Sequence, residues 1–236
     1  MFYDEKVVNI RNTGITAPVK QNCDINDLFV RKIKSCMKEG CKILDIGTGN
    51  GFVLKQINEN SDIKCILVGV DNSKKMVLTA RENLKEKATI YEGDNNNLKF
   101  DDNYFDIVTA KNVTVFSSEE IYRVLKNNGY FIFREYGKSK GLVEIANLFR
   151  DRLIRSRDSH YYSTKLESVG FEIVSIDEYV VNREYQSIQE IINITKSFPF
   201  ISNYSEGDEI IIRNTLNGCC NITSDPFILV AKKQER

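Results

Sequence analysis

Acidic and glycine residues with a regular spacing lie between Lys42 and Phe52, where the chain reads KILDIGTGNGF. Asp45 stands within a short apolar run, and Gly47, Gly49 and Gly51 follow it. A glycine turn of this kind presents backbone N–H groups, and the missing Cβ atoms let a ligand approach the main chain. Because Asp45 is acidic, we expect the ligand to carry a cationic group.

The spacing distinguishes this turn from two other glycine-rich nucleotide sites. A dinucleotide-binding turn has the pattern G-x-G-x-x-G, and its third glycine position is occupied here by Phe52. A triphosphate-binding loop ends in G-K-[ST], which this stretch does not contain. The pattern is instead D-x-G-x-G-x-G, placed between a predicted buried strand and a predicted helix with Val53, Leu54 and Ile57 on one face.

Two further acidic residues follow predicted strands. Asp71 ends ILVGVD, before a helix expected to begin near Ser73, and Asp94 follows a strand that ends at Gly93. Each also suits a structural role, Asp71 as a helix cap and Asp94 as a turn residue. A strand over 105–110 and a further strand within 124–135, behind a helix and a glycine turn, complete an alternation of strands and helices, which predicts a parallel sheet covered by helices on both faces. Such sheets bind ligands at the carboxyl ends of their strands.

In the order and spacing of these segments, residues 37–135 resemble the class I S-adenosylmethionine-dependent methyltransferases, whose first motif is D/E-x-G-x-G-x-G. The resemblance implies an α/β, Rossmann-like fold with a seven-stranded, mainly parallel sheet and an antiparallel last strand. It implies S-adenosyl-L-methionine as cofactor and S-adenosyl-L-homocysteine as product, with Asp71 bound to the ribose and Asp94 to the adenine amino group. The cofactor-binding residues expected on this basis are Asp45, Gly47, Thr48, Gly49, Asn50, Gly51, Asp71, Asn72, Met76, Asp94, Asn95 and Lys111.

The length predicts a single methyltransferase domain over residues 1–236 with additions around its core. We expect an N-terminal helical cap at 1–41, a cofactor-binding core at 42–135, a helix and strand completing the sheet at 136–182, a substrate lid at 183–225 and the last strand at 226–236. The cap contains a turn-rich stretch over 12–20 and a helix over 24–37, which would equally complete the outer layer of the sheet.

The lid is predicted from the aromatic stretch SFPFISNY, which would equally form a dimer contact or a satellite core. Before it, the patterns predict a helix over 137–157, another helix that begins at Ser163 or Thr164, and a strand over 171–181.

In the resembling family, the residues just before such a second helix border the active site. His160 would exchange a proton near neutral pH, although simple packing beside two tyrosines is the alternative. The catalytic candidates are His160, Tyr136 and Glu135. The substrate-binding candidates are Asn112, Phe116, Tyr161, Tyr162, Phe198 and Phe200.

Composition narrows the range of partners. The 33 basic and 33 acidic residues balance without a basic block, which argues against nucleic acid. No signal-peptide pattern or membrane-spanning run is visible, so we expect a cytoplasmic protein, monomeric or homodimeric. Six cysteines without a C-x-x-C pair and a single histidine predict no metal site, although the adjacent Cys219 and Cys220 would suit a soft metal.

The resemblance implies in-line methyl transfer to a small molecule, which depends mainly on holding the acceptor at attack distance. The fourth strand is followed by KNVTVF instead of D/N-P-P-Y/F, which argues against methylation of an adenine or glutamine amino group. A Pro-Cys nucleophile of the cytosine C5 type is also missing. The alternatives are a protein, carrier-bound acyl or RNA acceptor, or a methyltransferase-like protein that binds without transferring a methyl group.

Overall fold

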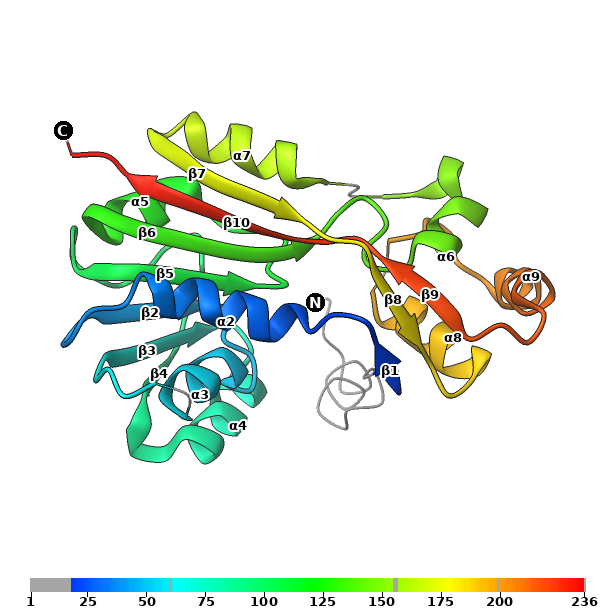
Figure 1. The fold of residues 1–236 in the computed structure, drawn as a ribbon, viewed down its shortest axis with the longest axis horizontal. Helices are drawn as coiled ribbons and strands as arrows, with labels where there is room; N and C mark the ends of the chain where they lie inside the picture. The colour runs from blue at the N-terminus through cyan, green and yellow to red at the C-terminus, as the bar shows by residue number, and fades with distance from the viewer. Residues whose placement is uncertain (1–17, 60, 155–156, 199, 236) are drawn as a thin grey trace. The chain divides into compact units, whose positions relative to one another are not determined.

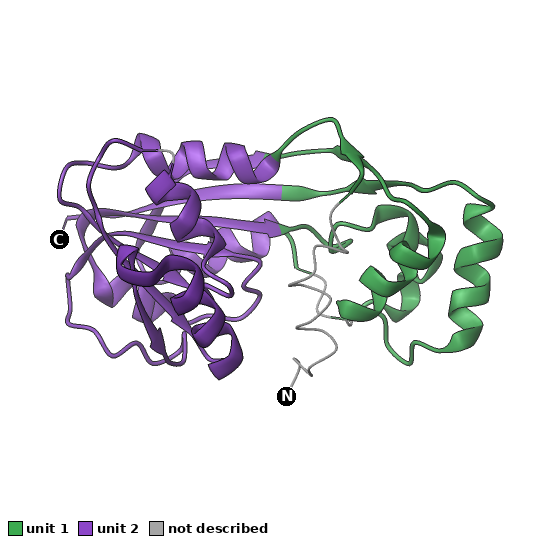
Figure 2. Ribbon diagram, turned by 90° about the horizontal axis from the view of Figure 1, so that it is seen from below, with its two compact units in different colours: residues 1–24, 136–158, 178–226 green, residues 25–135, 159–177, 227–236 purple. Residues whose placement is uncertain are grey.

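The computed structural model describes residues 18–59, 61–154, 157–198 and 200–235 (Figure 1). The first 17 residues of the expected cap lie outside the described residues. The chain forms two compact units, each assembled from three segments (Figure 2). Unit 1 comprises Met1–Asp24, Tyr136–Asp158 and Glu178–Pro226, and unit 2 comprises Ile25–Glu135, Ser159–Asp177 and Phe227–Arg236.

Unit 2 contains nearly all of a seven-stranded sheet with the strand order β4-β3-β2-β5-β6-β10-β7. The strands are β2 (Lys42–Ile46), β3 (Ile66–Asp71), β4 (Thr89–Glu92), β5 (Phe105–Lys111), β6 (Leu125–Tyr136), β7 (Phe171–Glu178) and β10 (Pro226–Lys233). β2 pairs in parallel with both β3 and β5, whereas β10 runs against its neighbours (Figure 1). The predicted Rossmann-like sheet with an antiparallel last strand is therefore confirmed.

The helices of unit 2 cover this sheet and bury its central strands. They are α2 (Ile25–Ser35), α3 (Phe52–Glu59), α4 (Lys74–Leu84), α5 (Ser118–Val124) and α7 (Ser159–Glu167), with a 3₁₀ turn η1 (Lys85–Lys87). Ile43, Leu44 and Ile46 of β2 are all fully buried, as expected for a central strand covered on both faces. The predicted helix start near Ser73 is confirmed, since its side chain accepts a hydrogen bond from the N–H of Met76 and caps α4.

Unit 1 has a smaller sheet and a hydrophobic core of its own. Its antiparallel sheet has the order β1-β8-β9, formed by β1 (Lys20–Gln21), β8 (Val181–Glu184) and β9 (Asn221–Ser224). Its helices are α6 (Val143–Leu148), α8 (Ile188–Ser197) and α9 (Glu206–Leu216), with a 3₁₀ turn η2 (Arg150–Arg152). Phe200 is buried among apolar residues of these helices and Phe198 packs against them, which corresponds to the satellite core named as an alternative to a lid.

Three predicted boundaries are wrong. α7 begins at Ser159 instead of Ser163 or Thr164, because the Ser163 hydroxyl donates to the His160 carbonyl within the helix and does not cap its start. The helix expected over 137–157 is reduced to α6 and η2, since the Asp225 carboxylate accepts from the N–H groups of Ser139 and Gly141 and holds the preceding residues in a loop. The strand expected over 171–181 ends at Glu178, and the chain then enters β8 of the other sheet.

In the part of the chain that the structure describes, no helix has the length and apolarity needed to cross a bilayer.

A buried lysine joins three elements of unit 2 near the end of the chain. Lys233 of β10 is 6% exposed, and its ammonium donates to the Tyr122 and Leu125 carbonyls at 2.8 and 2.7 Å and to Asn103 Oδ1 at 2.8 Å. It thereby links β10 to the end of α5 and the start of β6. A buried charge of this kind is tolerated because its donors are satisfied.

We predict that Lys233→Met lowers the free energy of unfolding by about 1–3 kcal/mol, because it leaves buried acceptors without a donor. Lys232→Met is the matched control, since adjacent residues of a strand point to opposite faces, and it should change stability by less than about 0.5 kcal/mol. Urea unfolding of both variants measures the difference. Equal stability of the two variants would contradict this role for Lys233.

Candidate functional site

The turn between β2 and α3 depends on three glycines with left-handed backbone angles. Gly47, Gly49 and Gly51 have φ values of +62°, +56° and +83°. A Cβ on Gly47 would lie 2.5 Å from a methyl group of Val113, and one on Gly51 would lie 2.6 Å from a methyl group of Leu84. A Cβ on Gly49 would meet nothing within 4 Å. The outer two glycines therefore permit close packing, whereas the middle glycine faces open space where a ligand can approach.

Asp45 is a buried acid beneath this turn. It is 1% exposed, and it lies opposite Thr109 in the register of β2 and β5. The Thr109 hydroxyl donates to Asp45 Oδ1 at 2.7 Å. Burial raises the pKa of the Asp45 carboxyl to about 6, while the Thr109 hydrogen bond and the positive charge of Lys111 act in the opposite direction. A cation bound beside Asp45 would hold it in the ionised form.

Asp71 connects the glycine turn to the next strand and helix. Its Oδ2 accepts from the N–H of Gly49 at 2.8 Å, and its Oδ1 accepts from the N–H of Ser73 at 2.9 Å. The N-cap of α4 is Ser73, so Asp71 does not have the capping role given as its alternative. A carboxylate oxygen has two acceptor sites, so each oxygen of Asp71 can accept one more hydrogen bond. The neighbouring Asn72 is exposed and Met76 is buried.

The turn after β4 brings an asparagine to the same edge of the sheet. Asp94 is exposed, and its Oδ1 accepts from the backbone and side-chain nitrogens of Asn96, both at 2.9 Å. The Asn95 amide lies beside Gly47, whose added Cβ would be 3.6 Å from Asn95 Nδ2. Among the described residues, no hydrogen-bond donor reaches the buried Asn95 Oδ1. A buried acceptor of this kind has room for a donor from a ligand.

Lys111 and Asn112 complete the edge at the end of β5. The Lys111 ammonium lies 4.8 Å from the ring centroid of Phe52, the first residue of α3. Asn112 has a φ of +58°, and its N–H donates to the Arg134 carbonyl at 2.9 Å, while the Arg134 guanidinium donates to its side-chain oxygen. The predicted cofactor-side residues therefore meet at the carboxyl ends of β2, β3, β4 and β5.

Two residues of this site were not anticipated from the sequence. Thr109 bonds to Asp45, and Val113 fills the space that a side chain at position 47 would need. A polar Thr109 between the apolar residues Val108 and Ala110 was the available signal for the first. The contact of Val113 depends on how the chain turns after β5, which periodicity does not describe.

The substrate-side candidates of unit 2 divide into core and surface. Phe116 and Tyr162 are 2% and 1% exposed, and their rings stack with centroids 5.9 Å apart within the aromatic core. Packing accounts for both residues. His160 and Tyr161, in the first turn of α7, are exposed, Tyr161 by 42%.

The other two catalytic candidates are adjacent on β6. Glu135 is 2% exposed, and the Tyr136 phenol oxygen accepts from a guanidinium nitrogen of Arg183 at 3.1 Å. Neighbouring residues of a strand point to opposite faces, so these two side chains do not share one face of β6. His160 lies on α7, so the three catalytic candidates do not lie on a common face of one element.

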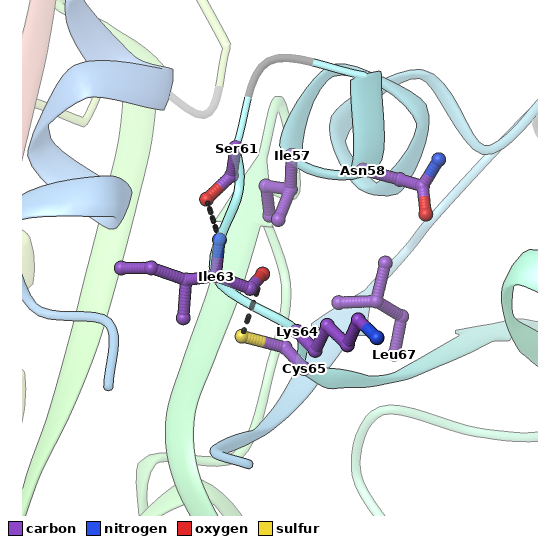
Figure 3. Close-up of a pocket in the computed structure, with 7 residues that line it drawn as sticks. All are labelled: Ile57, Asn58, Ser61, Ile63, Lys64, Cys65 and Leu67. Atoms are coloured by element: carbon purple, nitrogen blue, oxygen red, sulfur yellow. Dashed lines mark hydrogen bonds between the residues drawn. The ribbon is translucent and has the colours of Figure 1, made fainter. Parts of the chain in front are cut away.

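A separate cavity of about 280 Å³ lies at the opposite end of β3 (Figure 3). Its walls come from the end of α3, the following loop and the start of β3, namely Ile57, Asn58, Ser61, Ile63, Lys64, Cys65 and Leu67. It is therefore distinct from the edge that carries Asp71. Among the described residues, no group of three or more His, Cys, Asp or Glu side chains is placed to hold a metal ion.

Comparison with known proteins adds to this geometry. The family described as "Methyltransferase domain" matches residues 44–133. The chain is 37% identical over 106 residues to sterol 24-C-methyltransferase erg6 of Aspergillus fumigatus. This alignment covers 40% of this chain and 28% of the fungal protein. The chain is also 25% identical over 170 residues to sarcosine/dimethylglycine N-methyltransferase of Aphanothece halophytica, in an alignment that covers 64% of this chain and 60% of that enzyme. The chain thus spans less than two-thirds of the length of either relative.

A solved structure shares the fold. A protein of Bacillus halodurans C-125, provisionally described as a methyltransferase, superposes with a TM-score of 0.65 over 88% of this chain and 99% of its own. At 16% sequence identity this likeness concerns the fold alone.

We predict that the Asp45 carboxyl titrates near pH 6 and that Thr109→Val moves this midpoint to higher pH, because the hydrogen bond favours the ionised form. Between about pH 4 and 6 the folded protein keeps a proton that the unfolded chain has lost, so this group lowers stability as the pH rises through that window. As the pH rises from about 4 to 6, the free energy of unfolding of the wild type should fall by roughly 2–3 kcal/mol relative to that of Asp45→Asn. Above about pH 6 the difference between the two proteins should stay constant. Carbon-13 NMR gives the midpoint of the titration, and urea unfolding at several pH values gives the stability difference. If the stability of wild type and of Asp45→Asn depended on pH in the same way, the prediction would be wrong.

Proposed function

We propose that this chain is an enzyme that transfers a methyl group from S-adenosylmethionine to a small molecule. The premise is that residues 44–133 form a class I S-adenosylmethionine-dependent methyltransferase domain. The observation that carries the proposal is the meeting of the open Gly49 turn, the Asp71 carboxylate and the buried Asn95 amide oxygen at one edge of the sheet. Such an edge is the usual ligand-binding position in sheets of this topology.

The residues at this edge fit the groups of the cofactor. Asp71 would accept hydrogen bonds from the ribose hydroxyls with the lone pairs that Gly49 and Ser73 leave available. Asp94 stays the proposed partner of the adenine amino group, and the unsatisfied Asn95 Oδ1 is a second acceptor at the same strand end. Asp45, ionised, would favour the cationic methionine end.

The proposed mechanism relies on positioning. The bound cofactor would supply a methyl group on a sulfonium: an acceptor atom attacking in line would bond to this methyl group while its bond to sulfur breaks, and S-adenosylhomocysteine would leave as a neutral thioether. The chain's own contribution is to fix the cofactor through the Gly49 main chain and Asp71. Glu135, His160 and Tyr136 remain candidates for accepting a proton from a hydroxyl acceptor, but an amine or thiol acceptor would not require one.

The acceptor is proposed as a small molecule because the relatives named above act on sterols and on sarcosine or dimethylglycine. These acceptors differ so much in polarity that they do not indicate a particular compound. The balance of 33 basic and 33 acidic residues gives no support to an RNA acceptor.

Calorimetric titration of the purified chain with S-adenosylmethionine, S-adenosylhomocysteine and NADH tests the proposal. We expect micromolar affinity for the first two and none for NADH, because the turn lacks the third glycine of a dinucleotide site. Absence of binding by both sulfur compounds would overturn the proposal. Binding by all three would indicate a general nucleotide site.

Within the same titration, Asp71→Ala should weaken S-adenosylmethionine binding by roughly 10- to 150-fold, because hydrogen bonds to a charged group contribute about 1.5–3 kcal/mol. Asp62→Asn is the matched control: it also removes one negative charge, but from an exposed loop at the other end of β3. Because Asp71 also bonds to Gly49 and Ser73, circular dichroism must show that the variant is folded. Equal affinities for the two variants would remove Asp71 from the cofactor site.

A further inference from the structure

The small sheet of unit 1 has an arginine on its buried face. Exposure alternates along β8 and β9, so that Val181, Arg183, Ile222 and Ser224 share the inner face. The pairing register places Gln21 of β1 and Ile222 of β9 on either side of Arg183. The other members of this face are apolar or uncharged. Arg183 as a whole is half-buried, but its Nε atom is fully enclosed, so the surroundings of this donor require an explanation.

The described residues provide Arg183 with phenols but no anion. One guanidinium nitrogen donates to the Tyr136 phenol oxygen at 3.1 Å, and the guanidinium carbon lies 5.4 Å from the centre of the Tyr136 ring. The Nε atom is buried, and no acceptor among the described residues reaches it. Within the described part of the chain, no carboxylate forms an ion pair with Arg183. The guanidinium also interacts with the Tyr185 phenol, so the N–H donor left without an acceptor is the one on Nε.

Of the carboxylates on elements around Arg183, those of Glu190 and Glu144 have other partners and that of Glu184 faces away. Glu190 Oε2 accepts from the N–H of Gln186 at 3.0 Å, and Glu144 Oε2 accepts from the N–H of Thr223 at 2.8 Å. Glu184 follows Arg183 directly, so its exposed side chain lies on the other face of β8. Burial raises the pKa of the Tyr185 phenol even though the Arg183 cation opposes that shift, so Tyr185 is neutral at pH 7 and does not serve as a counter-ion.

A second polar group on the inner face is also unsatisfied. Ser224 is fully buried, and its hydroxyl has no partner among the described residues. It lies near Tyr136, because a Cβ on Gly141 would be 2.7 Å from the Tyr136 ring and 3.0 Å from Ser224 Oγ. Two buried polar groups of different elements are therefore left unsatisfied on one face, which is the pattern expected where a polar ligand completes the structure.

We propose that Arg183, with Tyr136, Tyr185 and Ser224, forms a binding site within unit 1 for the carboxylate of a small organic acid. The planar fork of a guanidinium matches the two oxygens of a carboxylate, and the hydroxyl groups supply further donors. Arg183 is one positive charge, which a monocarboxylate neutralises and a phosphate dianion exceeds. All four residues belong to unit 1, and Tyr136 is the member that this site shares with the proton-accepting candidates named above.

The ¹⁵N–¹H resonance of Arg183 Nε in the full-length protein provides a direct test, because this donor has no acceptor among the described residues. Sodium benzoate is the probe, benzamide is its uncharged control, and inorganic phosphate tests the charge preference. We expect benzoate to shift the resonance to a saturating value and to raise the melting temperature, whereas benzamide leaves both unchanged. Arg183→Met should weaken benzoate binding roughly 10- to 100-fold, and Arg183→Lys, which keeps the charge but loses the fork, should fall between.

Several outcomes would overturn the proposal: no saturable shift with benzoate, equal shifts with benzamide, or a preference for phosphate. Benzoate binding that survives in folded Arg183→Met would do the same. The wild-type titration is decisive even if both variants fail to fold. S-adenosylmethionine affinity is measured on the same sample, so a failure of this site with intact cofactor binding leaves the methyltransferase proposal standing, and the reverse result leaves this site standing.

Discussion

The bond between one carboxylate and two backbone N–H groups determines much of this site. Asp71 accepts from Gly49 in the turn after β2 and from Ser73 at the start of α4, and the Thr48 N–H adds a backbone bond to the Val70 carbonyl at 3.0 Å. These contacts fix a turn that has left-handed angles at three glycines and would otherwise have many alternative conformations. The open face at Gly49 is therefore built before any ligand arrives, so that binding requires little further ordering of the main chain.

The fold of unit 2 was predictable because its signals are local. Apolar runs such as Ile43–Ile46 indicate buried strands, and the D-x-G-x-G-x-G spacing identifies the turn that joins one of them to its helix. The start of α7 was missed since Ser163 resembles an N-cap in sequence but bonds to the His160 carbonyl inside the helix. β8 and β9 were missed because each is four residues long with a partly polar pattern that loops share. Their pairing joins segments far apart in the chain, which no local pattern records.

The residues that match the methyltransferase family all belong to one of the two compact units. The matched residues 44–133 lie entirely in unit 2, and no residue of unit 1 falls within the match. The family match therefore concerns the machinery proposed for the cofactor, whereas the longer alignment with the sarcosine/dimethylglycine enzyme, over 64% of this chain, also extends into unit 1. Aromatic residues that looked like substrate contacts, such as Phe116, Tyr162 and Phe200, are core residues of one unit or the other. Composition alone does not distinguish an aromatic lining from an aromatic core, because both are apolar surfaces that exclude water.

The strand order also has a consequence for how the chain is made. β10 lies between β6 and β7, and among the described strands β7 has no other neighbour in the sheet. During synthesis β7 leaves the ribosome before its partner β10, because residues 179–225 must be translated in between. Until then β6 and β7 both present unpaired edges, which are the surfaces most prone to pair with other chains. The sheet is therefore completed only after β10 has been translated, and loss of β10 would detach β7 as well.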